Sequence, residues 1–299
     1  MTRTAPAADD AGLMLKAAAD ATNNHYDLTP EIFECFLGEH MKYTCGIYAS
    51  DDCTLDEAQE AKLEFIANCL GIQGGERVLD IGVGWGALAL YLADRYDCQV
   101  LGITPSGTQA SYTRERARSR DLDDRVQVQQ CSVYDFKPDG AFDAVAMVGV
   151  IEHMPDHQRA VATAAGALKS GGRLYMSATC YRNDEQFTEF TPRDSSRHVQ
   201  ETIFGFATLR PFSKLVGAVE DAKLSLFRAT DLTLHYERTI RDWLEGIANH
   251  ADRIEELRPG LSAELTRYLE TVNTGWGHAT KHYALAAVRS RWGLTDVGR

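Results

Sequence analysis

The stretch Val78-Leu79-Asp80-Ile81-Gly82-Val83-Gly84-Trp85-Gly86 decides the fold. It begins as an apolar strand and runs directly into three alternate glycines, after which a helical pattern starts. Glycine lacks a Cβ atom, so a nucleotide-bearing ligand can approach the backbone closely at the carboxyl end of such a strand. Because a strand precedes the glycines and a helix follows them, we interpret the loop as a ligand site rather than an ordinary tight turn.

A regular alternation of strand and helix patterns continues beyond this loop. Strands are predicted at 77–81, 99–103, 125–129, 142–148 and 173–178, and helices at 85–96, 106–119 and 157–169. Gly171 and Gly172 are expected to end the last of these helices. Strands that alternate with helices are typical of a parallel, doubly wound sheet. The sequence therefore predicts an α/β fold.

The flanking segments complete a single predicted domain over 24–291, between a flexible N-terminal tail at 1–23 and a short tail at 292–299. A helix is expected from Thr54 to Leu70, because apolar residues recur at helical spacing and Thr54 with Glu57 makes a capping box. On the C-terminal side, the patterns predict a strand at 224–232, a helical region at 239–274 and a last strand at 281–289.

Between 181 and 223 the alternation is lost, and the segment is polar with two prolines. It carries five phenylalanines: Phe187, Phe190, Phe204, Phe206 and Phe212. Aromatic side chains in this number favour a partly buried cap over a cavity. The alternative interpretation is a plain surface insertion.

The composition excludes several classes of function. Lys and Arg number 31 against 43 Asp and Glu, and the resulting net charge of −12 repels nucleic acid. No apolar run reaches the roughly 18 residues that span a bilayer, and no secretory signal is recognisable. The seven cysteines are widely spaced, as expected for reduced thiols in a cytoplasmic protein, and the histidines show no metal-ligand spacing. The oligomeric state is not predicted.

The end of the second predicted strand narrows the choice of ligand. A dinucleotide site requires an Asp or Glu about 20 residues after the glycines to hold the ribose. The corresponding segment, 102–109, reads GITPSGTQ and contains no acid. A nicotinamide cofactor is therefore disfavoured, and ribose contacts would come from neutral groups such as Thr104 and Gln109. Asp80 is placed to meet the amino-acid part of S-adenosylmethionine (SAM), directly or through water.

Seven blocks of sequence follow one another in a recognisable order. They are His25-Tyr26-Asp27-Leu28 with Phe33; Lys42-Tyr43-Thr44-Cys45 with Tyr48; Thr54 to Gln59; the glycine loop; Gly102-Ile103-Thr104 with Ser106 and Gln109; Ile151-Glu152-His153; and His235-Tyr236 with Thr239 and Trp243. Together they resemble the cyclopropane-fatty-acid and mycolic-acid cyclopropane synthase family of SAM-dependent methyltransferases, which includes plant alkaloid N-methyltransferases. The resemblance extends from about Asn24 to Arg289.

The resemblance implies a class I methyltransferase sheet of seven strands, the last antiparallel, with a helical cap and with SAM as cofactor. The residues predicted to bind the cofactor are Tyr26, Tyr43, Thr44, Asp80, Gly82, Gly84, Gly86, Thr104, Ser106, Gln109, Ser132 and Val133. The family often has a tryptophan where Val133 falls, so stacking on the adenine is expected to be weaker here.

The resemblance also implies a catalytic group. Cyclopropane synthases hold a bicarbonate ion around a Cys, Glu, His and Tyr set, and this ion takes up the proton that a carbocation loses. Cys45, Glu152 and Tyr236 fall on three of those positions, whereas Ser177 falls where the histidine is expected. A serine hydroxyl cannot carry a charge, so the bicarbonate site is expected to be weakened or replaced. His153 completes the predicted catalytic residues, because the Glu-His pair lies beside the substrate nitrogen in the alkaloid enzymes.

Three functions follow from this set. The leading hypothesis is transfer of a methyl group, or of a methylene group with cyclopropane formation, to an alkene or electron-rich carbon of a small or lipid-like specialised metabolite. The second is N-methylation of a small amine. The third is a SAM-binding cyclase without net methyl transfer. In each case the expected partner is a small-molecule or lipid-like substrate, without stable membrane insertion.

Overall fold

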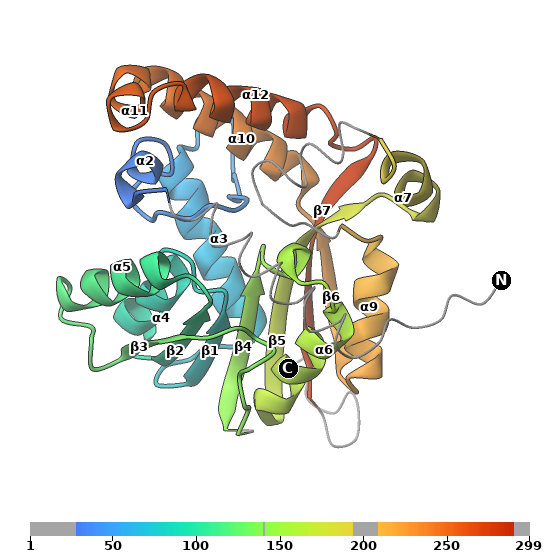
Figure 1. Ribbon diagram of the computed structural model, residues 1–299. Coiled ribbons are helices and arrows are strands. Elements are labelled where there is room, and N and C mark those ends of the chain that lie inside the picture. The colour runs from blue at the N-terminus through green and yellow to red at the C-terminus, as the bar shows by residue number, and fades with distance from the viewer. Residues whose placement is uncertain (1–27, 140, 194–208, 290–299) are drawn as a thin grey trace.

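The computed structural model describes residues 28–139, 141–193 and 209–289. Within them, seven strands form one mixed sheet (Figure 1). The strands are β1 (Arg77–Ile81), β2 (Gln99–Thr104), β3 (Val126–Gln130), β4 (Phe142–Val148), β5 (Leu168–Tyr181), β6 (Ser225–Asp231) and β7 (Thr280–Val288). Their order is β3-β2-β1-β4-β5-β7-β6, and β7 is antiparallel to both of its neighbours. The predicted seven-stranded fold with an antiparallel last strand is confirmed.

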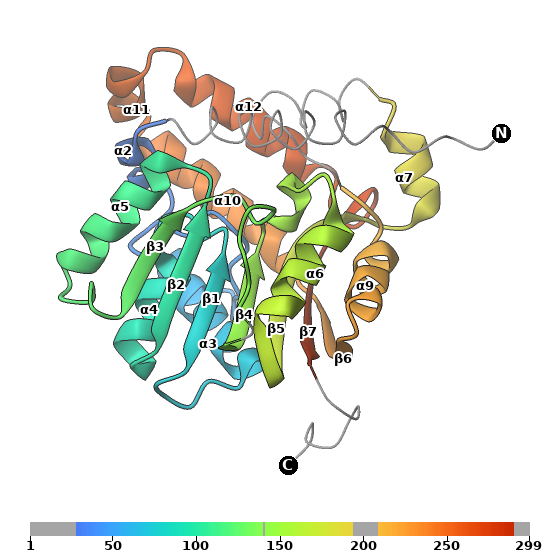
Figure 2. The ribbon, with the colours of Figure 1, turned by 60° about the horizontal axis from the view of Figure 1, so that its bottom comes forward.

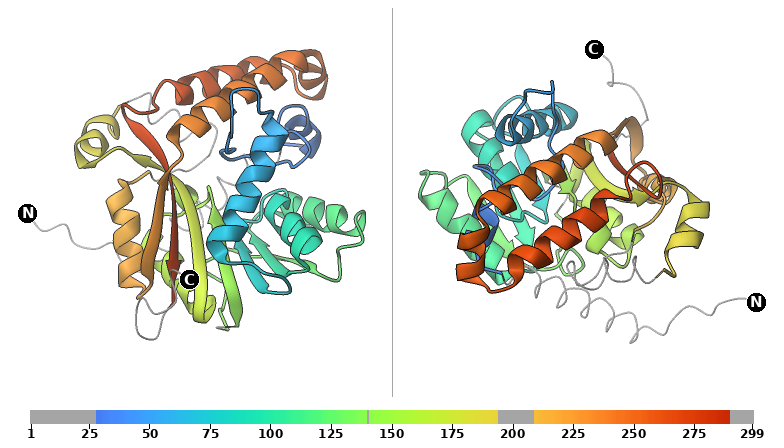
Figure 3. Two further views of the ribbon diagram at one scale, coloured as in Figure 1. Left: turned by 180° about the vertical axis from the view of Figure 1, so that it is seen from behind. Right: turned by 90° about the horizontal axis from the view of Figure 1, so that it is seen from above.

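Helices cover both faces of the sheet. α3 (Leu55–Leu70), α4 (Ala87–Tyr96) and α5 (Gly107–Arg118) pack on one face, and α6 (His157–Ala167) and α9 (Phe212–Asp221) pack on the other. Figure 2 shows α6 in front of the sheet, and the left view of Figure 3 shows α3 in front of the opposite face. This is the layering that a doubly wound sheet requires to bury both of its faces.

A third group of helices lies over the carboxyl ends of the strands and forms the helical cap (Figure 1). It comprises α2 (Pro30–Glu34), α10 (Thr233–Asn249), α11 (Ala251–Leu257) and α12 (Leu261–Asn273). These helices share a buried core that includes Phe33, Phe36, Trp243 and Leu265, and α10 and α12 run side by side (Figure 3, right). The cap therefore encloses the edge of the sheet at which the glycine loop emerges.

The predicted helix at Thr54 to Leu70 is confirmed together with its capping box. The Thr54 hydroxyl accepts a hydrogen bond from the Glu57 N–H at 3.3 Å, and the Glu57 carboxylate accepts one from the Thr54 N–H at 2.8 Å. Gly71, at φ +72°, ends the helix in the left-handed conformation that favours glycine. Both ends of α3 are thus specified locally by the sequence.

Several predicted boundaries are wrong. α6 ends at Ala167 rather than at Lys169, because Leu168 is already buried and paired with Phe142 of β4. Gly171 and Gly172 therefore lie inside β5, at an irregularity in its pairing with β4, and do not stop a helix. The C-terminal helical region begins at Thr233 instead of 239 and is divided into α10, α11 and α12.

Different parts of the segment predicted as a cap, 181–223, pack against different elements of the fold. α7 (Asp184–Phe190) contacts β5, whereas α9 packs on α6 and β6, and Phe212 stacks on Tyr283 at 4.6 Å between ring centroids. The C-terminal part of the segment is thus a sheet-covering helix, because its apolar residues face the core below α6. Phe204, Phe206 and the predicted tails at 1–23 and 292–299 lie outside the described residues.

Candidate active site

The three glycines after β1 have different tasks. All have positive φ: +77° at Gly82, +57° at Gly84 and +87° at Gly86. A Cβ atom on Gly82 would lie 2.4 Å from Val150, and one on Gly86 would lie 2.7 Å from Thr113, so both glycines permit close packing. A Cβ atom on Gly84 would meet only a backbone oxygen at 3.9 Å. The space beside Gly84 is therefore open, as a ligand-facing glycine requires.

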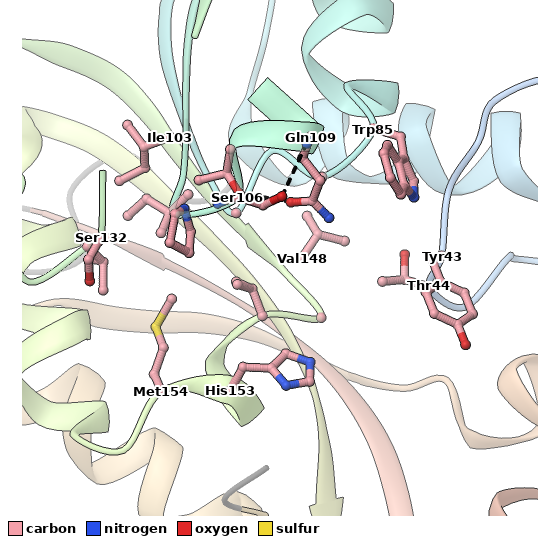
Figure 4. Close-up of a pocket in the computed structure, with 18 of the residues that line it drawn as sticks. Tyr43, Thr44, Trp85, Ile103, Ser106, Gln109, Ser132, Val148, His153 and Met154 are labelled. Carbon is pink, nitrogen blue, oxygen red and sulfur yellow. Dashed lines mark hydrogen bonds between the residues drawn. The ribbon is translucent and has the colours of Figure 1, made fainter. Parts of the chain in front are cut away.

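A pocket opens at this point, at the carboxyl ends of β1, β2 and β4. Nine of the twelve predicted cofactor residues line it: Tyr43, Thr44, Gly82, Gly84, Thr104, Ser106, Gln109, Ser132 and Val133. Figure 4 shows Ser132 at one end, Ser106 and Gln109 in the middle, and Tyr43 with Thr44 at the other end. The pocket is thus elongated, with three chemically distinct regions.

Three predicted cofactor residues do not line the pocket. Gly86 is the residue before α4 and faces Thr113, so its role is packing. Asp80 is fully buried beneath the loop, because its side chain points into the body of the protein. Tyr26 lies outside the described residues. Several residues that were not predicted also line the pocket, including Lys42, Trp85, Cys131 and Tyr134. The one feature of the sequence that could have indicated them is that each lies next to a predicted residue.

The turn after β2 is held by its own polar side chains. The Thr104 hydroxyl donates a hydrogen bond to the Gln109 side-chain oxygen at 2.9 Å, and the Ser106 N–H donates to the Thr104 hydroxyl at 3.2 Å. The Ser106 hydroxyl caps α5 by accepting from the Gln109 N–H. These neutral groups are fixed before any ligand binds, so this region of the pocket is preorganised.

Asp80 is a buried carboxylate without a hydrogen-bond partner. Both of its side-chain oxygens are unsatisfied, and burial raises the pKa of the carboxyl group to about 6, opposed by the positive charge of Lys42. A buried and unpaired carboxylate is costly to the fold. Asp80 lies in β1, immediately before the glycine loop.

Glu152 lies in the short helical turn η1 (Ile151–His153) that follows β4, and it is buried. One carboxylate oxygen accepts a hydrogen bond from the Thr179 N–H at 2.6 Å, and the other is buried without a partner. Burial raises the pKa of this carboxyl group to about 7. Glu152 can therefore exchange a proton near neutral pH, as a general base or acid must. The neighbouring residue, His153, lines the pocket (Figure 4).

Of the predicted catalytic residues, His153 alone lines the pocket, and Glu152, Cys45, Tyr236 and Ser177 lie outside its lining. The Cys45 sulfur lies 3.0 Å from the carbonyl oxygen of Gly46 and 3.7 Å from that of Leu232, either of which can accept its single proton. Burial raises the pKa of the thiol to about 12, which disfavours the thiolate that a nucleophile requires. Tyr236 packs edge-on against Trp243, with ring centroids 6.0 Å apart. Ser177 is buried on β5, and its carbonyl accepts from the Gly149 N–H at the end of β4.

A histidine missed by the sequence analysis connects two of these groups. His282 of β7 is fully buried opposite Thr179, and its Nδ1 atom lies 3.2 Å from the Thr179 hydroxyl. Its ring is 4.7 Å from the ring of Tyr236. Burial lowers the pKa of His282 to about 3, so the imidazole is neutral. Thr179 thus contacts Glu152 through its N–H and His282 through its hydroxyl.

The described residues contain no group of His, Cys, Asp or Glu side chains able to hold a metal ion. Within the same residues, every helix is too short or too polar to cross a bilayer.

The strand order, the antiparallel β7 and the pocket at the glycine loop together define the class I SAM-dependent methyltransferase fold. The chain belongs to the mycolic acid cyclopropane synthetase family, whose sequence model matches residues 14–285.

Individual relatives agree with this assignment. A probable fatty acid methyltransferase of Pseudomonas putida is 29% identical over 251 residues, which cover 83% of this chain and 63% of that protein. A probable (S)-tetrahydroprotoberberine N-methyltransferase of Papaver bracteatum is 30% identical over 244 residues, covering 80% and 67%. A solved cyclopropane synthase from Mycobacterium tuberculosis superposes with a TM-score of 0.82 at 25% identity, covering 90% of this chain and 97% of that one. The chain thus spans less than two thirds of the Pseudomonas relative.

Proposed function

We propose that the protein is a SAM-dependent methyltransferase that transfers a methyl group, or a methylene group with ring closure, to an alkene or electron-rich carbon of a small or lipid-like specialised metabolite. The observation that carries this proposal is a buried carboxylate of near-neutral pKa, Glu152, which lies shortly after β4 and next in sequence to the pocket-lining His153. The relatives include a probable fatty acid methyltransferase, which supports a lipid-like substrate.

The three regions of the pocket suit the three parts of SAM. Ser132 and Val133 offer a polar group and an apolar wall for the adenine, and Thr104 and Gln109 offer neutral hydrogen-bonding groups for the ribose. The methionyl part then extends past Gly84 towards Thr44. In this pose the sulfonium lies near the carboxyl end of β4, where Val148, Gly149 and His153 line the pocket.

When bound, SAM supplies an electrophilic methyl group on a positively charged sulfur. The protein has to align the acceptor carbon with the S–CH3 bond, exclude water and remove the proton that the methylated acceptor loses. The unpartnered oxygen of Glu152 is suited to the last task. A carboxylate of pKa about 7 is partly ionised at neutral pH, and it can take this proton without help from a stronger base.

The walls around Tyr43 favour an apolar acceptor. Tyr43 packs against Phe33, Phe36 and Trp243, with centroid distances of 5.6, 6.0 and 5.0 Å. This aromatic group joins α2 and α10 of the cap to the methionyl end of the pocket. Aromatic faces exclude water and also stabilise a cation on a nearby carbon. They therefore suit an alkene that acquires positive charge during methylation.

Bicarbonate as a second ligand remains a prediction. The Cys45 thiol is occupied by backbone carbonyls, and Ser177 offers no charge. Glu152 alone can accept the proton in the proposed reaction, so we expect turnover to persist when bicarbonate is removed from the buffer.

N-methylation of an amine is the second candidate function. It is favoured by the same buried carboxylate, because a carboxylate can orient an ammonium group and accept its proton. The Papaver relative, named as an N-methyltransferase, supports this alternative. Here Glu152 would orient the nitrogen and accept its proton before methyl transfer.

Product analysis separates the two candidates. The protein is incubated with SAM and libraries of alkenes, phenols and amines, S-adenosylhomocysteine release is measured, and the position of the new carbon is read by mass spectrometry and NMR. We expect a new C–C bond, and Glu152→Gln is the matched control that should bind cofactor yet turn over slowly. A methyl group found on nitrogen would refute the leading proposal. We place the reaction in the cytoplasm, in keeping with seven cysteines that are all free thiols.

A further inference from the structure

We infer that Lys42 is the residue that recognises the carboxylate of the cofactor's methionyl part, through a positive charge buried in the wall of the pocket. The inference rests on the proposed function and deepens it, because it assigns one chemical group of SAM to one side chain.

Lys42 has the position that this role requires. It is 5% exposed, lines the pocket and is next in sequence to Tyr43, which lies at one end of the pocket (Figure 4). Within the described residues, its ammonium group makes no hydrogen bond and no ion pair. An ammonium group has three donors, and the described residues supply no acceptor for any of them. A ligand with an anionic oxygen at this end of the pocket would supply the missing acceptor.

A second buried lysine strengthens the positive charge. Lys62 of α3 is 2% exposed, and its ammonium donates to the Thr44 hydroxyl at 2.9 Å. No carboxylate within the described residues lies within ion-pair distance of it. Thr44 itself lines the pocket, so Lys62 lies directly behind the wall to which Lys42 belongs.

The charges of this region do not balance. Lys42 and Lys62 carry two positive charges when protonated, and among the described residues Asp80 is the single carboxylate that interacts electrostatically with Lys42. Burial lowers the pKa of both lysines, and each Asp80 oxygen lacks a partner. Uncompensated buried charge is destabilising, whereas a carboxylate brought by a ligand neutralises it. The region is therefore arranged for an anionic group that the chain itself does not provide.

The shape of the pocket identifies which anionic group that is. Ser132 lies at the end opposite Thr44, and Gln109 lies between them (Figure 4). A nucleoside held by these residues leaves its amino-acid chain at the Lys42 end. The carboxylate is the one anionic group on that chain, so it is the group that meets the lysine.

The test compares two ligands that differ in one group. S-adenosylhomocysteine and its decarboxylated analogue, which keeps the adenosine, sulfur and amino group, are titrated calorimetrically into the wild type, Lys42→Met, Lys42→Arg and the exposed control Lys214→Met. For the wild type and for Lys214→Met, we expect the carboxylate to improve affinity by about 10- to 100-fold, the size of a hydrogen bond between charged groups. In Lys42→Met this advantage should disappear, with affinity for the decarboxylated ligand unchanged. Lys42→Arg should recover part of it.

Each contrary result has a distinct meaning. Equal weakening of both ligands in Lys42→Met, or no weakening of either, overturns the assignment of Lys42 while the pocket still binds the nucleoside. Failure of the wild type to bind either ligand overturns the proposed function itself. Thermal unfolding gives an independent readout: S-adenosylhomocysteine should raise the melting temperature of the wild type more than the decarboxylated analogue does, and Lys42→Met should lose this difference. An equal rise with the two ligands in the wild type would refute the inference.

Discussion

Replacement of Glu152 by glutamine should stabilise the protein at alkaline pH and not at acidic pH. Burial raises the pKa of Glu152 from 4.5 to about 7, so the folded protein holds a proton that the unfolded chain has already lost between these values. The free energy of unfolding therefore falls as the pH rises from 4.5 to 7, and it falls no further above about pH 7. A shift of this size corresponds to about 3 kcal/mol, of which about 2.5 kcal/mol develops between pH 5 and pH 8.

Glutamine has nearly the same shape and no charge to bury. Its amide can leave an N–H group unpaired where the second carboxylate oxygen was, which costs about 1 to 3 kcal/mol but does not depend on pH. The pH dependence thus isolates the ionisation of Glu152 from the packing change.

The assay is urea unfolding, followed by circular dichroism at pH 5, 6, 7 and 8, of the wild type, Glu152→Gln and the exposed control Glu220→Gln. We expect the difference in unfolding free energy between Glu152→Gln and wild type to move by about 2.5 kcal/mol in favour of the variant across this range. The control should show no comparable trend. A difference that stays constant with pH would refute the reasoning that Glu152 is a desolvated carboxylate.

Other predictions concern turnover, the cofactor loop and the fold. Wild-type turnover should rise with pH through about 7 as Glu152 ionises. Glu152→Gln should lower turnover by about 10²- to 10⁴-fold and flatten its dependence on pH. Turnover equal to that of the wild type would remove Glu152 from the mechanism. Gly84→Val should abolish binding of S-adenosylhomocysteine measured by calorimetry, because its side chain enters the pocket at φ +57°, and an unchanged affinity would contradict the proposed cofactor position. Val133→Trp should tighten that binding by adding a surface on which adenine stacks, and the absence of any effect would place the adenine elsewhere. Thr54→Ala should cost about 1 kcal/mol in urea unfolding through loss of the α3 cap, with an exposed Ser111→Ala change as a comparison.

The strands of the sheet were predictable because their signals are local. β1 and β4 have the predicted bounds, since each is an apolar run followed by glycine. The end of α6 was not predictable, because Leu168 and the residues after it continue a helical pattern until pairing with Phe142 of β4 draws them into the sheet. That pairing depends on a residue more than twenty positions away, and the local periodicity of apolar residues carries no information about it.

The cofactor side of the site was more predictable than the catalytic side. Residues such as Thr104 and Gln109 follow strand ends, and parallel strands bring their carboxyl ends to one edge of the sheet. His282 and Lys62 carried no such signal. His282 is a single histidine in the last strand, and Lys62 is a lysine on an amphipathic helix. The role of each becomes visible only when it is buried against a distant segment of the chain.

The central claim is that the pocket after β1 holds an adenosyl sulfonium whose methyl group faces the end of β4. A crystal structure of the protein with S-adenosylhomocysteine tests it most directly. We predict the adenine beside Val133, the ribose beside Gln109, and the sulfur between Gly84 and His153, on the side from which Glu152 is reached. A nucleoside bound elsewhere, or a sulfur directed away from β4, would contradict the account.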